Sequence, residues 1–189
     1  MVVPPTALDL LRGDLRNRRQ AVAKSHKTPL FSMNPRLRDL VESAKTIGIY
    51  LPMGGEPDPL PLVAGYVGVT SLPAFSDDLP MTFRRWSPGD PLERSSWGGQ
   101  QPRQTAESVL PSVIIVPLLG FDAAFNRSGQ GGGHYDRYLE AHPAACRVGL
   151  AWEAQRVDSI EPQPWDVPLD AILTETEFYV KDLTRCQRP

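Results

Sequence analysis

A glycine-rich turn between a strand and a helix is the feature that most constrains this chain. Residues 113–116 form a β-branched run typical of a buried strand, and residues 135–141 have the pattern of a helix that begins just after the turn. Glycines leave backbone N–H groups uncovered at a helix N-terminus, and such groups bind anions, most often phosphate. The turn therefore predicts the floor of an active site, built from Gly129, Gly131, Gly132 and Gly133 with Arg127 upstream.

Strands and helices alternate along the rest of the chain, which is typical of an α/β domain with a parallel sheet. Helices are expected over 7–24 and from Pro35 onward with Asn34 as the cap, and a short helical piece near 60–66. We predict one α/β domain over residues 1–189, a three-layer sandwich with a mostly parallel central sheet and helices on both faces. Residues 87–103, rich in Pro, Gly, Ser and Gln, are expected to be a long loop over the site. Strands are expected over 46–51, 67–71, 79–86, 113–118, 147–152 and 171–174.

Composition excludes several classes of function. The net charge of −2 gives no indication of a nucleic-acid partner. No stretch approaches the roughly 20 apolar residues that span a bilayer, so we expect a soluble, cytoplasmic protein without a membrane partner. Cys146 and Cys186 lie far apart in the sequence, and we expect reduced thiols without a disulfide between them.

The order of residues in the turn excludes two common phosphate-binding motifs. A P-loop needs Lys and then Ser or Thr after its last glycine, and here His134 follows Gly133. The dinucleotide pattern G-x-G-x-x-G also fails, because its sixth position from Gly129 is again His134. Arg127 can clamp phosphate oxygens, and Asp136 can hold the Mg²⁺ that accompanies ATP. Alternatively, Asp136 is only a favourable partner of the helix dipole.

Two further side chains outside the turn, and the basic face of the first helix, can each be interpreted in two ways. Glu56 lies in a rigid loop after the strand 46–51, where it can bind a polar ligand or remain a solvated carboxylate. Trp97 can stack on a flat ring or pack down on the protein. The first helix carries a basic face that is either solvated or brings Arg12 or Arg18 to a phosphate.

The segment 117–137 resembles the signature of one family, the 5-formyltetrahydrofolate cyclo-ligases, also called 5,10-methenyltetrahydrofolate synthetases. Residues 149–152 and 169–175, with Gln155 and Asp166, resemble the C-terminal pattern of that family. The shared order makes the set more specific than any one match. The matching signature positions are Pro117, Leu118, Phe121, Asp122, Arg127, Gly129, Gly131, Gly133, Tyr135, Asp136 and Arg137.

The resemblance implies a NagB/RpiA/CoA-transferase-like fold and an enzyme that needs ATP and Mg²⁺. In the implied reaction the formyl oxygen of 5-formyltetrahydrofolate attacks the γ-phosphate of ATP, which releases ADP. N10 then closes the ring, and phosphate leaves to give 5,10-methenyltetrahydrofolate. The substrate is expected with or without a polyglutamate tail, and the oligomeric state stays open.

The resemblance also implies roles for individual residues. Arg127 and Tyr135 are implied as catalytic, and Asp136 and Asp170 as the ligands of Mg²⁺. The folate is expected to contact Leu51, Glu56, Trp97 and Tyr135. ATP is expected to contact Arg12, Arg18, Arg127, Gly129, Gln130, Gly131, Gly132, Gly133, His134 and Tyr135.

Several positions depart from the family pattern. The family has a lysine at the position of Leu8, a leucine at Ser128 and a tyrosine at His134. These departures leave two alternatives open. One is a paralogue on the same fold that binds another nucleotide- or pterin-like ligand with weak or no cyclo-ligase activity, and the other is a non-enzymatic binding domain. Further departures are Phe125 for glycine, Gln130 for arginine or tyrosine, and Trp165 for histidine.

Overall fold

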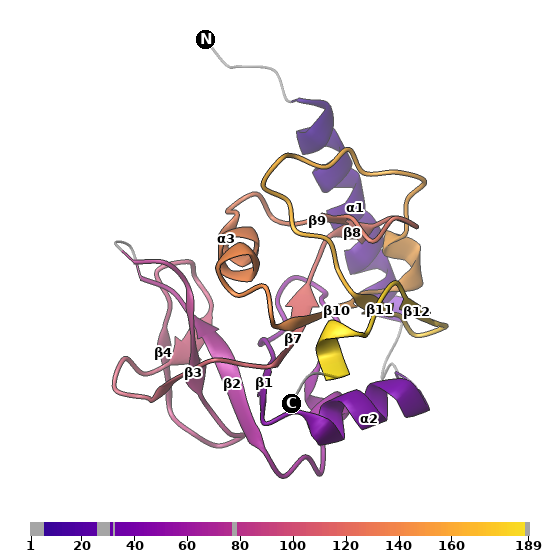
Figure 1. The fold of residues 1–189 in the computed structure, drawn as a ribbon. Coiled ribbons are helices and arrows are strands. Elements are labelled where there is room, and N and C mark those ends of the chain that lie inside the picture. The colour runs from indigo at the N-terminus through magenta and orange to yellow at the C-terminus, as the bar shows by residue number, and fades with distance from the viewer. Residues whose placement is uncertain (1–5, 26–30, 32, 77–78, 188–189) are drawn as a thin grey trace.

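The computed structural model describes residues 6–25, 31, 33–76 and 79–187, and it has an eight-stranded central sheet (Figure 1). The strand order is β12-β11-β10-β7-β1-β2-β3-β6. The five middle strands run parallel: β11 (Ala171–Leu173), β10 (Cys146–Leu150), β7 (Val113–Pro117), β1 (Thr46–Gly48) and β2 (Val69–Ala74). Antiparallel strands close both edges: β12 (Phe178–Val180) on one side, and β3 (Thr82–Arg85) and β6 (Ser108–Val109) on the other.

Helices cover both faces of the sheet, as predicted. Val113 and Ile115 of β7 belong to the same core cluster as α2 (Pro35–Ser43), whereas Ile114 and Val116 belong to the cluster of α3 (His134–Ala141). This alternation follows from the two-residue period of a strand, which sends successive side chains to opposite faces. Figure 1 shows α2 and α3 on opposite sides of the sheet. The mostly parallel α/β sandwich is therefore confirmed.

The helix α1 (Ala7–Ser25) packs beyond the ends of the strands. The side chain of Leu15 is fully buried and fits against Gly120, where an added Cβ would lie 2.6 Å from Leu15 Cδ1. Gly120 lies in β8 (Gly120–Phe121), which pairs with β9 (Arg127–Ser128) in a small hairpin directly after β7. Within the described residues, short 3₁₀ turns occur at Leu60–Val63, Glu153–Gln155 and Arg185–Gln187.

Two expectations about regular structure are corrected. The segment 87–103 is not one long loop, because β4 (Leu92–Arg94) and β5 (Gln100–Pro102) pair as an antiparallel hairpin. Each strand has three residues and pairs only with the other, so neither presents an apolar period in the sequence. The predicted strand 46–51 is ladder-paired only over Thr46–Gly48, and the chain continues from there into the loop that carries Glu56.

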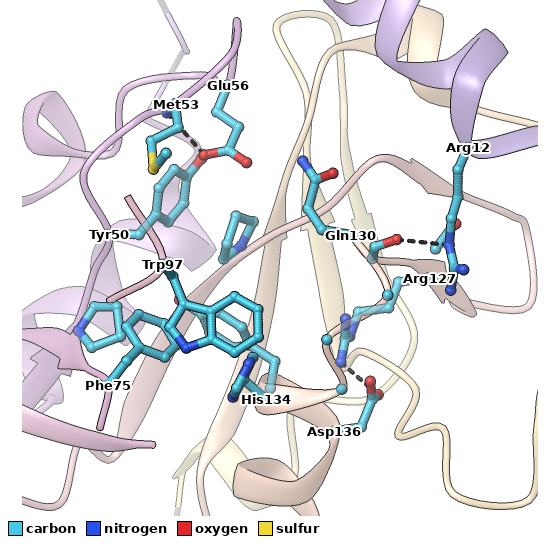
Figure 2. Close-up of a pocket in the computed structure, with 18 of the residues that line it drawn as sticks. Arg12, Tyr50, Met53, Glu56, Phe75, Trp97, Arg127, Gln130, His134 and Asp136 are labelled. Atoms are coloured by element: carbon cyan, nitrogen blue, oxygen red, sulfur yellow. Dashed lines mark hydrogen bonds and ion pairs between the residues drawn. The ribbon is translucent and has the colours of Figure 1, made fainter. Parts of the chain in front are cut away.

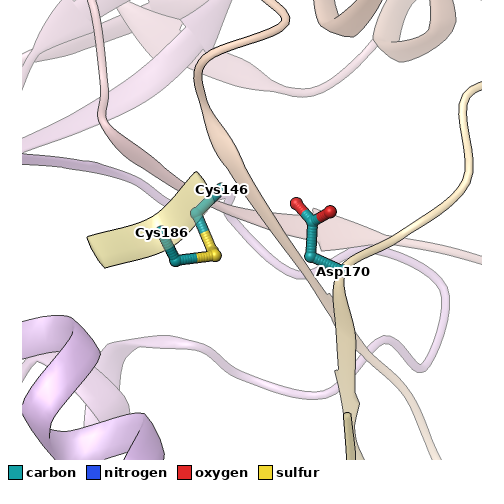
Figure 3. A group of neighbouring side chains, drawn as sticks. All are labelled: Cys146, Asp170 and Cys186. Carbon is teal, nitrogen blue, oxygen red and sulfur yellow. A yellow bond between two sulfur atoms is a disulfide. The ribbon is translucent and has the colours of Figure 1, made fainter. Parts of the chain in front are cut away.

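The expectation of free thiols is wrong, because Cys146 and Cys186 form a disulfide (Figure 3). Cys146 begins β10, and the C-terminal segment folds back over it, so the two Cα atoms lie 4.9 Å apart despite 40 residues of separation. Sequence distance gives no measure of that proximity. Among the described residues, no helix is long and apolar enough to cross a membrane.

Candidate active site

A cavity of about 810 Å³ opens at the carboxyl ends of the parallel strands. Tyr50 and Leu51 after β1, Pro73 in β2 and Pro117 at the end of β7 all line it. The volume lies within the range of small-molecule sites, and ligands of open α/β folds bind at the carboxyl ends of the parallel strands. Figure 2 shows Tyr50 and Glu56 on one side of the cavity and Arg127 and Asp136 on the other.

The glycine turn forms one wall of the cavity. Gly131 has φ of +101° and Gly133, the N-cap of α3, has φ of +63°, a conformation that residues with a Cβ rarely adopt. The helix α1 holds the turn from outside, since Arg12 Nε donates to the carbonyl of Gly129 at 3.1 Å. One turn further along α1, Arg16 Nε donates to Oε1 of Gln130 at 3.1 Å. Two arginine side chains of α1 therefore hold the glycine turn in place.

A buried ion pair lies next to this turn. Nη2 of Arg127 is 2.6 Å from Oδ1 of Asp136, and only 4% of the Arg127 side chain is exposed. The hairpin β8–β9 presents Arg127, and the first turn of α3 presents Asp136. The backbone N–H of Val167 also points to Oδ1 of Asp136 at 3.4 Å, so the loop 161–167 closes this side.

A second buried ion pair lies across the cavity. Nη1 of Arg19 is 2.9 Å from Oε1 of Glu56, and the two side chains are 4% and 11% exposed. The other carboxylate oxygen of Glu56 accepts from the backbone N–H of Met53 at 3.0 Å. Burial raises the pKa of the Glu56 carboxyl above its usual range, although the charge of Arg19 and these hydrogen bonds work in the opposite direction. Arg19 thus fixes the Glu56 carboxyl at the cavity wall.

Aromatic rings form the third side. The ring of His134 meets Trp97 edge to face at a centroid distance of 4.5 Å and meets Phe75 at 5.2 Å (Figure 2). Trp97 is 58% exposed although it lines the cavity, so one of its faces is available to a flat ligand. Its hairpin β4–β5 positions it there.

Four buried polar atoms, all in residues that line the cavity, have no hydrogen-bond partner among the described residues. They belong to consecutive or neighbouring positions of the turn: Nε of Arg127, Oγ of Ser128, Nε2 of His134 and the hydroxyl of Tyr135. Burial, followed by the charge of Glu56, raises the pKa of Tyr135 well above its usual value, so its phenol stays protonated. Buried polar groups in folded proteins nearly always have partners. All four belong to residues that line the cavity, so this wall carries polar groups whose hydrogen bonds the described residues do not satisfy.

Most of the residues implied by the family resemblance lie together in this cavity. Arg18 is an exception, since it faces solvent and pairs with Asp14 at 2.7 Å. Asp170 is the other exception, because it directly precedes β11 and so lies at the amino ends of the parallel strands, whereas the cavity lies at their carboxyl ends. There its carboxylate accepts a hydrogen bond from the backbone N–H of Arg147 and pairs with Arg185. The implied residues that do line the cavity are Arg12, Leu51, Glu56, Trp97, Arg127, Gly129, Gln130, Gly131, Gly132, Gly133, His134, Tyr135 and Asp136.

Sequence reasoning missed Arg19, although a signal was present. Positions 12, 16 and 19 are spaced by four and three residues and share one helical face, whereas position 18 points elsewhere. Extending the face of Arg12 along the helix selects Arg16 and Arg19 over Arg18. Phe75 and Tyr50 were also missed, since one buried aromatic residue in a strand or loop does not differ in sequence from a core residue.

Comparisons with known proteins agree with this geometry. A sequence profile described as the 5-formyltetrahydrofolate cyclo-ligase family matches residues 6–175. A protein of that name from Escherichia coli is 32% identical over 151 residues, which cover 74% of this chain and 82% of the relative. The match to one from Haemophilus influenzae is 36% identical over 99 residues and covers 49% of this chain and about half, 53%, of that relative.

A solved structure has the same architecture. The 5,10-methenyltetrahydrofolate synthetase of Aquifex aeolicus superposes with a TM-score of 0.66 over 90% of this chain and 92% of its own, at 26% identity. The likeness therefore extends over most of the chain and is not confined to the glycine turn.

Proposed function

The chain belongs to the 5-formyltetrahydrofolate cyclo-ligase family, and on that premise we propose that it converts 5-formyltetrahydrofolate to 5,10-methenyltetrahydrofolate at the expense of ATP. The products beside the methenyl compound are ADP and phosphate. The observation that carries the proposal is a single cavity with a phosphate-type glycine turn on one side and a fixed carboxylate with aromatic rings on the other.

ATP is assigned to the side of the glycine turn. The N–H groups of a helix N-terminus and the guanidinium of Arg127 suit the charge of a polyphosphate. Arg12 adds a second cation from α1, and it already contacts the turn through the carbonyl of Gly129. The unpartnered Nε of Arg127 supports this assignment, because a phosphate oxygen would satisfy it.

The folate is assigned to the opposite side. The pterin ring carries N–H donors that suit the carboxylate of Glu56, and Arg19 holds that carboxylate in place. The exposed ring of Trp97 and the apolar side chain of Leu51 suit the flat faces of the ligand. With ATP across the cavity, this arrangement brings the formyl oxygen toward the terminal phosphoryl group.

The chemistry then needs alignment and neutralisation of charge. The formyl oxygen attacks the γ-phosphorus, the bond to ADP breaks, and an N5-iminium phosphate forms. N10 attacks that carbon and loses its proton to the departing phosphate, which leaves as the ring closes. Arg127 neutralises charge that builds up on the transferred group, and the protonated phenol of Tyr135 donates a hydrogen bond to it.

We also infer that Mg²⁺ accompanies ATP and that Asp136 binds it. The carboxylate of Asp136 fits this ion, which uses one or two carboxylates together with substrate phosphates. When bound, the ion would neutralise phosphate charge. Asp170 is not part of this site: its carboxylate lies near Cys146 and Cys186, away from the cavity, and these two cysteines are joined in a disulfide and so offer no thiolate to a metal ion.

The test is to mix the protein with ATP, Mg²⁺ and 5-formyltetrahydrofolate and to follow the absorbance of the bridged methenyl cation. We expect that signal to need all three additions. The departures at Leu8 and Gln130, which both line the cavity, favour a second candidate, a paralogue that binds another pterin-like ligand. Calorimetry separates the two, since the paralogue binds ATP without binding 5-formyltetrahydrofolate.

A further inference from the structure

The loop that carries Glu56 is a tight turn over residues 53–57. The backbone N–H of Glu56 donates to the carbonyl of Met53 at 3.1 Å. Gly54 and Gly55 both have positive φ, +56° and +85°. Glycine adopts this conformation without strain, but it also leaves the backbone freer than other residues would. The place of Glu56 therefore depends on what holds the carbonyls of this turn.

Three side-chain donors bind those carbonyls, and they come from α1, from just after β1 and from just after β10. The carbonyls directly before and after Glu56 are both among the acceptors. The hydrogen bonds run from Arg19 Nε to the carbonyl of Gly54 (3.1 Å), from Trp152 Nε1 to that of Gly55 (2.8 Å) and from the Tyr50 hydroxyl to that of Pro57 (2.8 Å).

Trp152 differs from the other two donors because it is not part of the site itself. Tyr50 lines the cavity, and Arg19 binds the Glu56 carboxylate directly. Trp152 is only 2% exposed and does not line the cavity. Any effect of its indole N–H on a ligand must therefore pass through the turn 53–57.

The main chain of Trp152 is anchored to the segment that leads to the glycine turn. Its backbone N–H donates to Oε1 of Gln155 at 2.8 Å. Nε2 of Gln155, which is fully buried, donates to the carbonyls of Leu118 and Leu119, each at 2.9 Å. These two residues connect β7 to the β8–β9 hairpin. The indole thus holds the turn 53–57 in a fixed relation to the opposite wall of the cavity.

We propose that Trp152 is a positioning residue for the folate, because its indole N–H sets the place of the Glu56 carboxylate through the carbonyl of Gly55. The two left-handed glycines leave the turn free to pivot when that carbonyl is released. A carboxylate displaced in this way remains buried beside Arg19 but meets the pterin ring out of alignment. The inference rests on the proposed function, since it takes Glu56 as a folate contact.

The test compares the binding of 5-formyltetrahydrofolate and of ATP by calorimetry in the wild type and in Trp152→Phe. Without the indole N–H, the folate must itself reorder the released turn, at a cost no larger than the worth of the lost hydrogen bond. A hydrogen bond between neutral groups is worth roughly two- to twelvefold in affinity, so 5-formyltetrahydrofolate binding should weaken by up to about that factor. ATP affinity should stay unchanged. In steady-state kinetics, KM for the folate should rise while KM for ATP stays the same.

Trp86→Phe is the matched control. Trp86 is also buried, and its Nε1 donates to the carbonyl of Asp90 at 3.2 Å outside the cavity. The two substitutions remove the same ring and the same type of hydrogen bond, so both should lower the melting temperature of the ligand-free protein. Only Trp152→Phe should weaken folate binding.

Benzothienylalanine at position 152 separates the hydrogen bond from the packing of the ring. This residue keeps the two-ring shape of tryptophan and has sulfur in place of the N–H group. We expect it to weaken 5-formyltetrahydrofolate binding as Trp152→Phe does, and it answers the question even where Trp152→Phe does not fold.

A double-mutant cycle with Glu56→Gln tests the route through Glu56. If Trp152 acts on the folate by placing the Glu56 carboxylate, adding Trp152→Phe to Glu56→Gln should cost less folate affinity than Trp152→Phe costs in the wild type. Fully additive losses would mean that the two residues act independently.

Three results would overturn the inference. The first is unchanged 5-formyltetrahydrofolate affinity when the indole N–H at position 152 is removed, and the second is an equal loss of ATP affinity. The third is additivity in the cycle with Glu56→Gln. A wild type that does not bind 5-formyltetrahydrofolate contradicts the proposed function itself, whereas these three results leave that function standing.

Discussion

Nη2 of Arg127 lies 2.6 Å from Oδ1 of Asp136, and this buried pair joins the β8–β9 hairpin to the first turn of α3. The pair gives the floor of the cavity a cation and an anion that are both fixed before any ligand arrives. An arginine alone would be a phosphate site, and an aspartate alone would be a partner of the helix dipole. Together they suit the phosphates of ATP and the ion that travels with them.

Asp136→Asn should lower kcat/KM for ATP by about 100-fold or more, because the substitution removes the proposed ligand of Mg²⁺ and releases Arg127 from its position. Asparagine keeps the shape of the side chain, so we expect a folded protein by circular dichroism. Steady-state kinetics at several Mg²⁺ concentrations check the effect. The control is Asp158→Asn at an exposed position outside the cavity. Equal kinetics in the two variants would remove Asp136 from the site.

Glu56→Ala should destabilise the ligand-free protein by about 3–5 kcal/mol, because it leaves the buried guanidinium of Arg19 without its partner. Arg18→Ala, which breaks an exposed pair with Asp14, should cost no more than about 1 kcal/mol. Urea unfolding of both variants without ligand measures the difference. Similar losses in the two would show that Arg19 does not depend on Glu56.

Stability should depend on pH through His134. Burial, with a smaller contribution from the charge of Arg137, lowers the pKa of His134 below its ordinary value of 6.5. The unfolded chain therefore binds a proton at a higher pH than the native one does, so unfolding free energy rises as pH increases through the interval from the lowered pKa to 6.5. The difference in unfolding free energy between wild type and His134→Gln should follow this rise. A difference that stays flat or falls with pH would contradict it.

Reduction of the Cys146–Cys186 disulfide should destabilise the fold by about 2–4 kcal/mol, because the bond closes a long loop in the unfolded chain. Unfolding with and without a thiol reductant measures this. Cys186→Ser lacks the bond, so its unfolding free energy should equal that of the reduced wild type and should not respond to the reductant. A wild type whose stability is unaffected by reductant would mean that the two thiols are not joined.

The site could be predicted from the sequence where its signal is local. The strand, glycine turn and helix around Arg127 and Asp136 are contiguous, and the required backbone conformation at Gly131 and Gly133 restricts those positions to glycine. The helix at Pro35 was also predictable, since Asn34 caps it by accepting a hydrogen bond from Arg36 N.

The predictions that were wrong concern contacts between segments that are distant in the sequence. The resemblance matches Asp170 by residue type. It does not show that this residue precedes its strand and therefore lies at the amino ends of the parallel strands, away from the cavity. The disulfide and the Arg19–Glu56 pair likewise form only when the chain has folded. Short strands such as β4 and β5 stabilise each other and therefore have no pattern of their own.

The most direct test of the central claim is a crystal structure of the protein with ADP and 5-formyltetrahydrofolate bound together. We predict phosphate density on the turn formed by residues 129–133, within hydrogen-bond reach of Arg127, and a pterin ring between Trp97 and the carboxylate of Glu56. Density for either ligand outside this cavity would contradict the claim that one cavity holds both substrates.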